Sequence, residues 1–183
     1  MSRSMFLIAL AATTMLCIVP SSSVSAANNQ VARGRYLVTV IGCGDCHTPG
    51  YFFGKPDQTR YLAGSDVGFA IPKLGVFVAP NLTRDSETGL GKWTTEQIAT
   101  AITTGKRPDG RVLAPIMPWQ DLANLTRADA RAIAAYLKSL PPIRRAVPGP
   151  FGPTDKVNVF VMGVLPPDTY NSLAAQRQHE QAK

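Results

Sequence analysis

An all-α domain with long loops is the fold class that the sequence predicts. Two stretches, Thr94–Gly105 and Thr126–Leu140, combine helical spacing of apolar residues with capping signals, and a further helix is expected over Asn28–Ile41. The intervening segment Gly50–Lys92 is rich in glycine and shows little periodicity. A composition of 45% apolar and 17% charged residues is that of a globular protein and excludes a disordered or fibrous chain.

Residues 1–26 have the three-part pattern of a secretory signal peptide. Arg3 supplies positive charge, Met5–Val19 form an apolar run, and Val24–Ala26 resemble a cleavage site. The apolar run is shorter than the roughly 20 residues that a transmembrane helix needs. We therefore expect residues 27–183 to be exported to the periplasm as a soluble protein without a transmembrane anchor.

The first expected helix, Asn28–Ile41, contains Gly34, which costs about 1 kcal/mol relative to alanine. A close crossing by another helix would explain a glycine at this position. The apolar stripe of the last helix is the expected partner, and it consists of Ile133, Tyr136, Leu137 and Leu140.

Gly50–Lys92 is interpreted as a long ordered loop region with one short hairpin around Phe69–Ala79. A loop of this length without repeating elements usually has a function or wraps a cofactor. Its aromatic residues are scattered and do not alternate; they are Tyr51, Phe52, Phe53, Tyr61, Phe69 and Phe77.

The next two helices have clear starts and ends. Thr94 and Gln97 form a capping box, and Gly105 is a C-terminal stop. Thr126 caps the last helix, which ends before Pro141-Pro142. We expect a domain over residues 27–142, followed by a proline-rich tail, residues 143–183, that is extended and packed on it.

The cysteine pattern indicates a cofactor. Cys43, Cys46 and His47 form Cys-x-x-Cys-His, the attachment signature of c-type haem. In one helical turn both thiols fall on one side and can form thioethers to haem vinyl groups, and His47 can then bind the iron. A thioredoxin-like pair would need a βαβ setting, and a zinc site would need four ligands, whereas the remaining histidine, His179, lies in the polar C-terminal residues. We therefore predict one covalently attached haem c, against which the aromatic residues of the long loop pack.

The second axial ligand is expected to be Met117. It lies in a loop between two helices, and Pro115 and Pro118 restrict the backbone around it. Ordinary core packing is the alternative role for a methionine. Met162 and His179 are the other candidates, although Met162 looks like tail packing and His179 like an exposed residue.

The haem motif and five further segments together resemble class I c-type cytochromes, in particular the cytochrome domains of bacterial alcohol, aldehyde and sugar-acid dehydrogenase complexes. The segments are Arg33–Leu37, Cys43–Pro49, Asn81–Trp93, Gly105–Arg111, Met117–Trp119 and Ala134–Pro142. The resemblance implies a class I cytochrome c fold, with helices wrapped around one covalently bound haem. It also implies Cys43 and Cys46 as attachment points, His47 as proximal ligand and Met117 as distal ligand.

The leading functional hypothesis is a periplasmic carrier of single electrons from a dehydrogenase to a respiratory acceptor, either a cytochrome or an oxidase. Such a carrier needs no catalytic residues of its own. Those dehydrogenase complexes typically string together three haem units, whereas this sequence has one motif, so a free carrier is the simpler interpretation. An electron-entry subunit of a dehydrogenase complex is the first alternative. A haem enzyme or gas sensor with an open iron site is the second.

Charge is consistent with protein partners. The chain has 19 Lys and Arg residues against 12 Asp and Glu, a formal net charge of +7. The basic residues are scattered, which does not favour nucleic-acid binding and suits an acidic protein partner or an anionic membrane surface. Lys106, Arg107 and Arg111 are candidate ion-pair partners for haem propionates, and Trp119 is a candidate hydrogen-bond donor to one.

Overall fold

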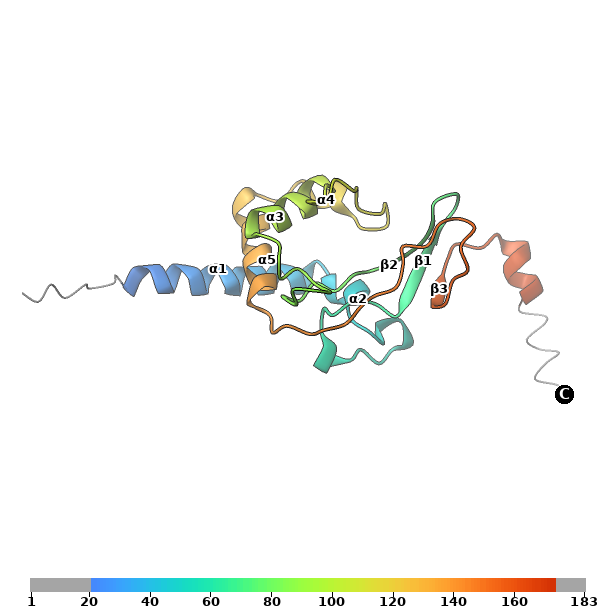
Figure 1. The fold of residues 1–183 in the computed structure, drawn as a ribbon, viewed down its shortest axis with the longest axis horizontal. Helices are drawn as coiled ribbons and strands as arrows, with labels where there is room; N and C mark the ends of the chain where they lie inside the picture. Colours follow the sequence, from blue (N-terminus) through green and yellow to red (C-terminus); the bar gives the residue numbers. More distant parts are fainter. Residues whose placement is uncertain (1–20, 174–183) are drawn as a thin grey trace, which may run out of the picture.

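The structure, a computed structural model, describes residues 21–173 (Figure 1). The predicted signal peptide lies largely outside the described residues, as does His179, and the expected cleavage point after Ala26 falls within the first helix. The elements in chain order are α1 (Ser21–Val40), α2 (Cys43–His47), η1 (Tyr51–Phe53), η2 (Gln58–Arg60), β1 (Val67–Ile71), β2 (Gly75–Val78), α3 (Thr95–Thr104), α4 (Trp119–Leu122), α5 (Arg127–Ser139) and β3 (Phe160–Met162).

The packing of α1 against α5 organises the core. Gly34 is buried, and a side chain at this position would collide with the backbone carbonyl of Ala132 on α5. At the rim of the contact Arg33 Nε donates to Asp129 Oδ1 at 2.8 Å. The predicted close crossing at Gly34 is therefore confirmed. The buried core residues of these helices, of α3 and of the long loop are Leu37, Val38, Leu62, Ile98, Ala99, Ala130, Ile133, Ala134 and Leu137.

The capping predictions for α3 and α5 are also confirmed. Thr94 Oγ1 accepts from the Gln97 backbone N–H at 3.1 Å, and Gln97 Oε1 accepts from the Thr94 N–H at 2.9 Å. Gly105 ends α3 in the left-handed conformation. Thr126 caps α5 by accepting from the backbone N–H of Asp129. The caps fix where both helices begin, and hence the loop between them.

A three-stranded sheet of order β2-β1-β3 corrects the all-α prediction. The hairpin expected around Phe69–Ala79 is present as antiparallel β1 and β2, with Phe69 opposite Phe77. The strand that the sequence did not predict is β3, which pairs in parallel with β1, Phe69 standing opposite Met162. The physical reason for the error is distance along the chain: β3 is only three residues long, and its partner strand is far upstream.

The chain after α5 runs back along the loops near α2 and then joins the sheet (Figure 1). Phe151 and Val76 exchange two backbone hydrogen bonds of 2.9 Å, which attach this segment to β2. Within residues 21–173, no helix has both the length and the apolar character that a bilayer crossing requires.

Candidate haem-binding site

The short helix α2 carries both cysteines and the histidine. Gly42 precedes it with a φ of 78°, a left-handed conformation that L residues with side chains rarely adopt, and this turn lets α2 begin with only two residues between it and α1. Cys43 and Cys46 are half-buried free thiols. Burial is the main cause that raises the pKa of Cys43 to about 11, and burial also raises the pKa of Cys46. Redox-active dithiols instead have lowered pKa values, so this environment does not favour a thioredoxin-like pair.

His47 is held as a metal ligand would be. Its side chain is buried, and Nδ1 lies 2.8 Å from the carbonyl oxygen of Pro80. Because a carbonyl can only accept, Nδ1 carries the proton, and Nε2 keeps its lone pair. Burial lowers the pKa of His47, which favours the neutral ring. A backbone carbonyl behind the ring is the usual way in which proteins orient a ligating histidine.

Buried polar groups hold the chain on both sides of His47. The His47 carbonyl accepts from Gly64 N–H at 2.8 Å, and Thr48 Oγ1 accepts from Leu62 N–H at 3.2 Å. Asn81, which follows Pro80, is almost fully buried, and its Oδ1 accepts from the N–H of Thr83 at 2.9 Å. Sequence reasoning assigned no role to Pro80, because its contribution is a backbone oxygen that no side-chain pattern reveals.

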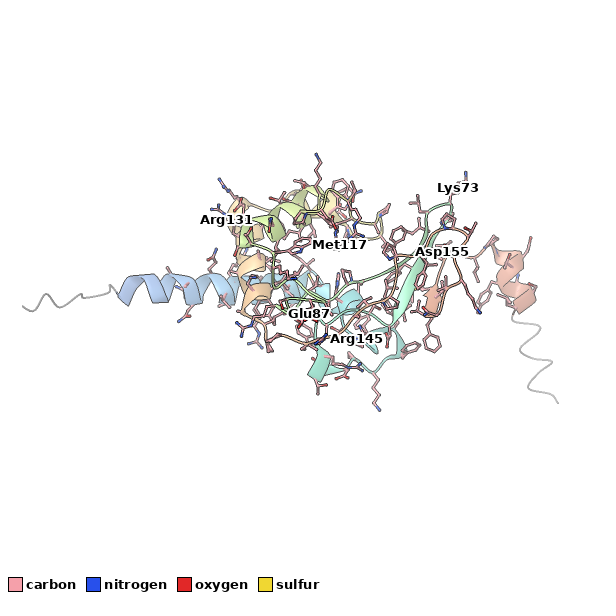
Figure 2. All side chains as sticks on the ribbon, in the orientation of Figure 1. Lys73, Glu87, Met117, Arg131, Arg145 and Asp155 are labelled. Carbon is pink, nitrogen blue, oxygen red and sulfur yellow. The ribbon has the colours of Figure 1, made fainter. Side chains whose placement is uncertain are left out.

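Met117 lies in the loop between α3 and α4 and is half-buried. The loop is tightly turned there: Met117 N–H donates to Ala114 O at 2.9 Å, and Trp119 N–H donates to Met117 O at 2.8 Å. Figure 2 shows Met117 below α3 and α4, on the side of these helices that faces α2. Met162, the alternative ligand, lies on β3 and is 43% exposed. Met117 is thus less exposed than Met162, and its role as a ligand stays a prediction.

Trp119 has an indole N–H that is buried and has no hydrogen-bond partner among the described residues. Its ring packs against Gly105, at the end of α3. A buried donor without an acceptor costs about 1–3 kcal/mol, so such a group usually marks the place of an acceptor that comes from outside the polypeptide. A haem carboxylate is an acceptor of this kind, and the residues present therefore fit the group that the Cys-x-x-Cys-His motif implies.

Two of the three basic residues considered for propionate binding have a protein partner. Arg111 Nη2 donates to Asp109 Oδ2 at 2.8 Å, and Arg107 Nε donates to the same carboxylate at 3.3 Å. The guanidinium of Arg107 also lies 5.3 Å from the ring centroid of Trp93. Mainly through the hydrogen bond from Arg111, the pKa of Asp109 is lowered to about 2. These contacts stabilise the start of the loop that carries Met117.

A short helix with paired thiols and a histidine whose ring is oriented by a backbone carbonyl defines a c-type haem protein. Comparison with known families agrees, because residues 31–141 match the family model for cytochrome c. The chain belongs to the cytochrome c family.

Three relatives show the setting in which similar sequences occur. The fructose dehydrogenase cytochrome subunit of Gluconobacter japonicus is 38% identical over 117 residues, which are 62% of this chain and 23% of that protein. The cytochrome c subunit of a quinone alcohol dehydrogenase from Gluconacetobacter polyoxogenes is 36% identical over 62% of this chain and 25% of that protein. A diheme cytochrome c-type protein of Cereibacter sphaeroides is 38% identical over 61% of this chain and 36% of its own length. The chain thus spans only a quarter to a third of these relatives.

Proposed function

We propose that this protein is a periplasmic cytochrome c with a single haem, and that it carries single electrons from a dehydrogenase to a respiratory acceptor. The observation that carries the proposal is the buried His47, whose Nδ1–H donates to the Pro80 carbonyl and which lies on the same short helix as Cys43 and Cys46. The names of the relatives, which are cytochrome subunits of fructose and alcohol dehydrogenases, support a dehydrogenase as the electron donor.

Each site residue has one task in this proposal. Cys43 and Cys46 would hold the haem through two thioether bonds, and His47 Nε2 and Met117 Sδ would bind the iron. The chemistry that a bound haem supplies is reversible one-electron exchange between its ferric and ferrous states. With His47 and Met117 both holding the iron, no open position would remain for a substrate, and the chain would convert no substrate itself.

The remaining side chains adjust the site. The Pro80 carbonyl fixes the His47 ring and increases its basicity as a ligand. A methionine thioether favours the ferrous state and raises the reduction potential relative to other second ligands. Trp119 would donate its indole N–H to a haem carboxylate, which would give this buried group the partner that residues 21–173 do not offer.

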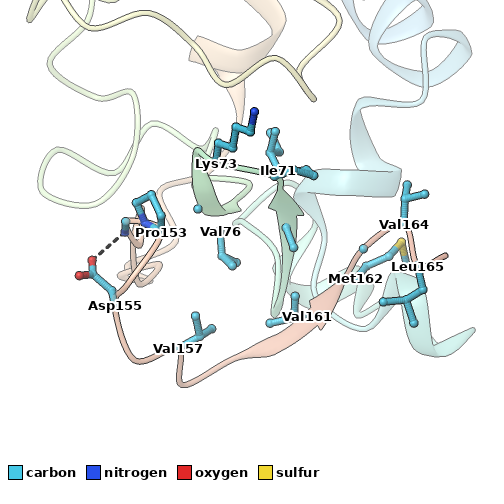
Figure 3. A pocket seen from close by; sticks show the side chains of 15 residues that line it. Ile71, Lys73, Val76, Pro153, Asp155, Val157, Val161, Met162, Val164 and Leu165 are labelled. Atoms are coloured by element: carbon cyan, nitrogen blue, oxygen red, sulfur yellow. Dashed lines mark hydrogen bonds between the residues drawn. The ribbon is translucent and has the colours of Figure 1, made fainter. Parts of the chain in front are cut away.

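One observation favours a second candidate function, that of an electron-entry subunit bound in a dehydrogenase complex. The tail presents an apolar surface around β3, and it consists of Phe160, Val161, Met162, Val164 and Leu165. Phe160 is 67% exposed and Val164 is 95% exposed. Beside them, between the tail and the β1–β2 hairpin, lies an open cavity of about 650 Å³ (Figure 3). Exposed apolar patches commonly mark protein contacts.

Absorption spectroscopy of the purified holoprotein tests the proposed function. We expect the weak near-infrared sulfur-to-iron band in the oxidised protein and no rapid binding of carbon monoxide to the reduced protein. Met117→Ala should abolish the band, lower the midpoint potential and open the iron to carbon monoxide. Met162→Ala is the matched control and should change none of the three.

Other results would contradict the proposed function or decide between its two forms. Fast, stoichiometric carbon monoxide binding by the unmutated protein would show an open iron site and support a haem enzyme or sensor instead. For the second candidate, copurification with a larger dehydrogenase subunit that is lost in Val164→Glu would show a complex subunit. A monomer that still accepts electrons from the dehydrogenase after this change would show a free carrier.

A further inference from the structure

Two loop segments flank His47, and they are bonded to each other. The first, Leu62–Ser65, reaches the backbone of His47 through the 2.8 Å bond from Gly64 N–H to the His47 carbonyl. The second, Ala79–Thr83, contains Pro80, whose carbonyl accepts from the His47 ring. Leu82 N–H donates to Leu62 O at 2.8 Å, and Ser65 N–H donates to Ala79 O at 2.9 Å. The orientation of the imidazole therefore depends on how these two segments are held relative to each other.

Arg145, which follows α5 and lies beyond the segment that matches the cytochrome c family, is attached to the first of these segments. Its Nη1 donates to the carbonyl of Ala63 at 3.2 Å, and its Nη2 donates to the carbonyl of Ser65 at 2.9 Å. The two acceptors lie on either side of Gly64, the residue that is bonded to His47. One planar guanidinium thus binds two carbonyls of this segment in a fixed geometry.

The same stretch of backbone is attached to the second segment. Ile143 O accepts from Asn81 Nδ2 at 2.7 Å, and Ile143 N–H donates to Thr83 Oγ1 at 3.1 Å. The backbone N–H of Arg145 donates to Thr88 Oγ1 at 3.0 Å, and Thr88 Oγ1 in turn accepts from Asn81 Nδ2. Ile143 and Arg145 therefore connect both segments that hold His47.

The neighbouring Arg144 shows how differently an adjacent arginine is used. Its Nη2 pairs with Glu87 Oε2 at 2.6 Å, and the Arg144 side chain is 75% exposed. Arg145 is less exposed, and the acceptors of its guanidinium are two backbone carbonyls. Removing water from a guanidinium without a bonded carboxylate is unfavourable, and burial lowers the pKa of Arg145. This arrangement is better explained by fixing two loops than by a surface ion pair.

We propose that Arg145 is a positioning residue for the proximal ligand. Its guanidinium bonds the carbonyls of Ala63 and Ser65, and its backbone N–H reaches the Ala79–Thr83 segment through Thr88 and Asn81, so that Arg145 holds the His47 Nδ1–H against the Pro80 carbonyl. The inference rests on the proposed function, because it assigns the tail a role in setting the haem ligand. It also predicts that the His47 ring loosens when the guanidinium is removed, even though Arg145 does not touch the ring.

The test is the rate at which the His47 Nδ1 proton exchanges with water, measured by NMR on the reduced holoprotein well below the melting temperature of each variant. A hydrogen bond that involves a charged group contributes about 1.5–3 kcal/mol, so Arg145→Ala should speed this exchange by about tenfold or more. Arg145→Lys keeps the charge but cannot bind two carbonyls as a planar fork, and it should give an intermediate rate. Arg144→Ala, which removes one positive charge at the preceding residue, should leave the exchange rate unchanged.

Two results would overturn the inference. The first is an Arg145→Ala protein with a lower melting temperature but an unchanged Nδ1 exchange rate, because that is the behaviour of a merely structural contact. The second is an equal increase in Arg144→Ala, which would assign the effect to charge. If Arg145→Ala does not fold, the Nδ1 exchange rates of Arg145→Lys and Arg144→Ala are compared instead. A rate that is no higher in Arg145→Lys than in Arg144→Ala would overturn the inference. The ring resonances of His47 in the unmutated protein report iron ligation separately, so a failure of the proposed function is recognised independently.

Discussion

Nδ1 of His47 and the carbonyl oxygen of Pro80, 33 residues further along the chain, lie 2.8 Å apart. This hydrogen bond determines which ring nitrogen is free to bind a metal, and it joins α2 to the loop that follows β2. In the proposed function, a ring held in this way would not need to reorganise when the iron changes oxidation state, and small reorganisation would favour fast electron transfer. The two residues therefore link the fold of the long loop directly to the proposed chemistry.

The contact between α1 and α5 predicts the effect of enlarging Gly34. Gly34→Leu should lower the free energy of unfolding of the holoprotein by about 3 kcal/mol, because the Ala132 carbonyl occupies the space that the side chain would need. Guanidinium unfolding followed by circular dichroism would measure the loss. Ala32→Leu adds an apolar side chain to an exposed position of the same helix and is the matched control. An unchanged midpoint in Gly34→Leu would contradict the packing.

Covalent attachment predicts a specific mass. The mature protein should begin near Ala27 and carry one haem that acid–acetone extraction does not remove. Cys46→Ala should leave at most one thioether, with a low yield of holoprotein, since only Cys43 remains to hold the group. Mass spectrometry measures both results. Haem that is extracted from the unmutated protein would show that attachment is not covalent, and a mass that retains residues 1–26 would show that the leader is kept.

The unpartnered indole of Trp119 predicts the result of removing a single N–H group. Trp119→Phe keeps an aromatic ring against Gly105, and it should destabilise the holoprotein by about 1–3 kcal/mol if the N–H donates to a haem carboxylate. The change should also raise the pKa of that carboxylate, because a donor to its ionised form is lost. A Trp119→Phe holoprotein as stable as the unmutated one would show that the N–H has no acceptor there.

The Asp109 cluster predicts a pH dependence of stability at low pH. Asp109 has a pKa of about 2 in the folded protein, below its ordinary value of 3.8, mainly because Arg111 donates to it. Its contribution to stability is therefore present above about pH 4 and is lost as the pH falls through about 2. Asp109→Asn should be less stable than the unmutated protein near neutral pH, and melting curves should show the two converging toward pH 2.

The same measurement in 1 M salt provides the control for Asp109. The carboxylate is exposed, so added salt should screen its attraction to Arg107 and Arg111 and reduce the difference between the two proteins. A difference that persists unchanged at pH 2 would show that Asp109→Asn acts through the conformation of the turn and not through charge.

Local rules explain the parts of the fold that could be predicted. The caps at Thr94 and Thr126 operate within three residues, and a glycine at position 34, unfavourable inside a helix, indicates the close approach of another element. The pairing of β3 with β1 could not be predicted, because three exposed residues carry little signal and their partner strand is far away in the sequence. Long-range pairing of short strands is decided by tertiary packing, which no local pattern records.

The candidate site divides in a similar way. Cys43, Cys46, His47 and Met117 stand out through spacing and side-chain chemistry, and their roles as ligands stay predictions for the experiments above. What the sequence did not indicate is how the protein holds them. Pro80 acts through its backbone oxygen, and the guanidinium of Arg145 binds backbone carbonyls. Backbone atoms are the same in every residue, so no side-chain pattern in the sequence indicates either contact.

The packing of α1 on α5 also has a consequence for the order of folding. The pair Arg33 and Asp129, at the edge of this contact, closes a loop of 96 residues, and the chain entropy of closing it is on the order of 4 kcal/mol. Contacts between such distant residues slow the search for the native state. Because α5 covers Gly34, the N-terminal half of a newly made chain stays exposed until α5 has emerged as well. The thiols of Cys43 and Cys46 would stay accessible during that interval, and late closure of the domain would give the proposed haem attachment time to occur.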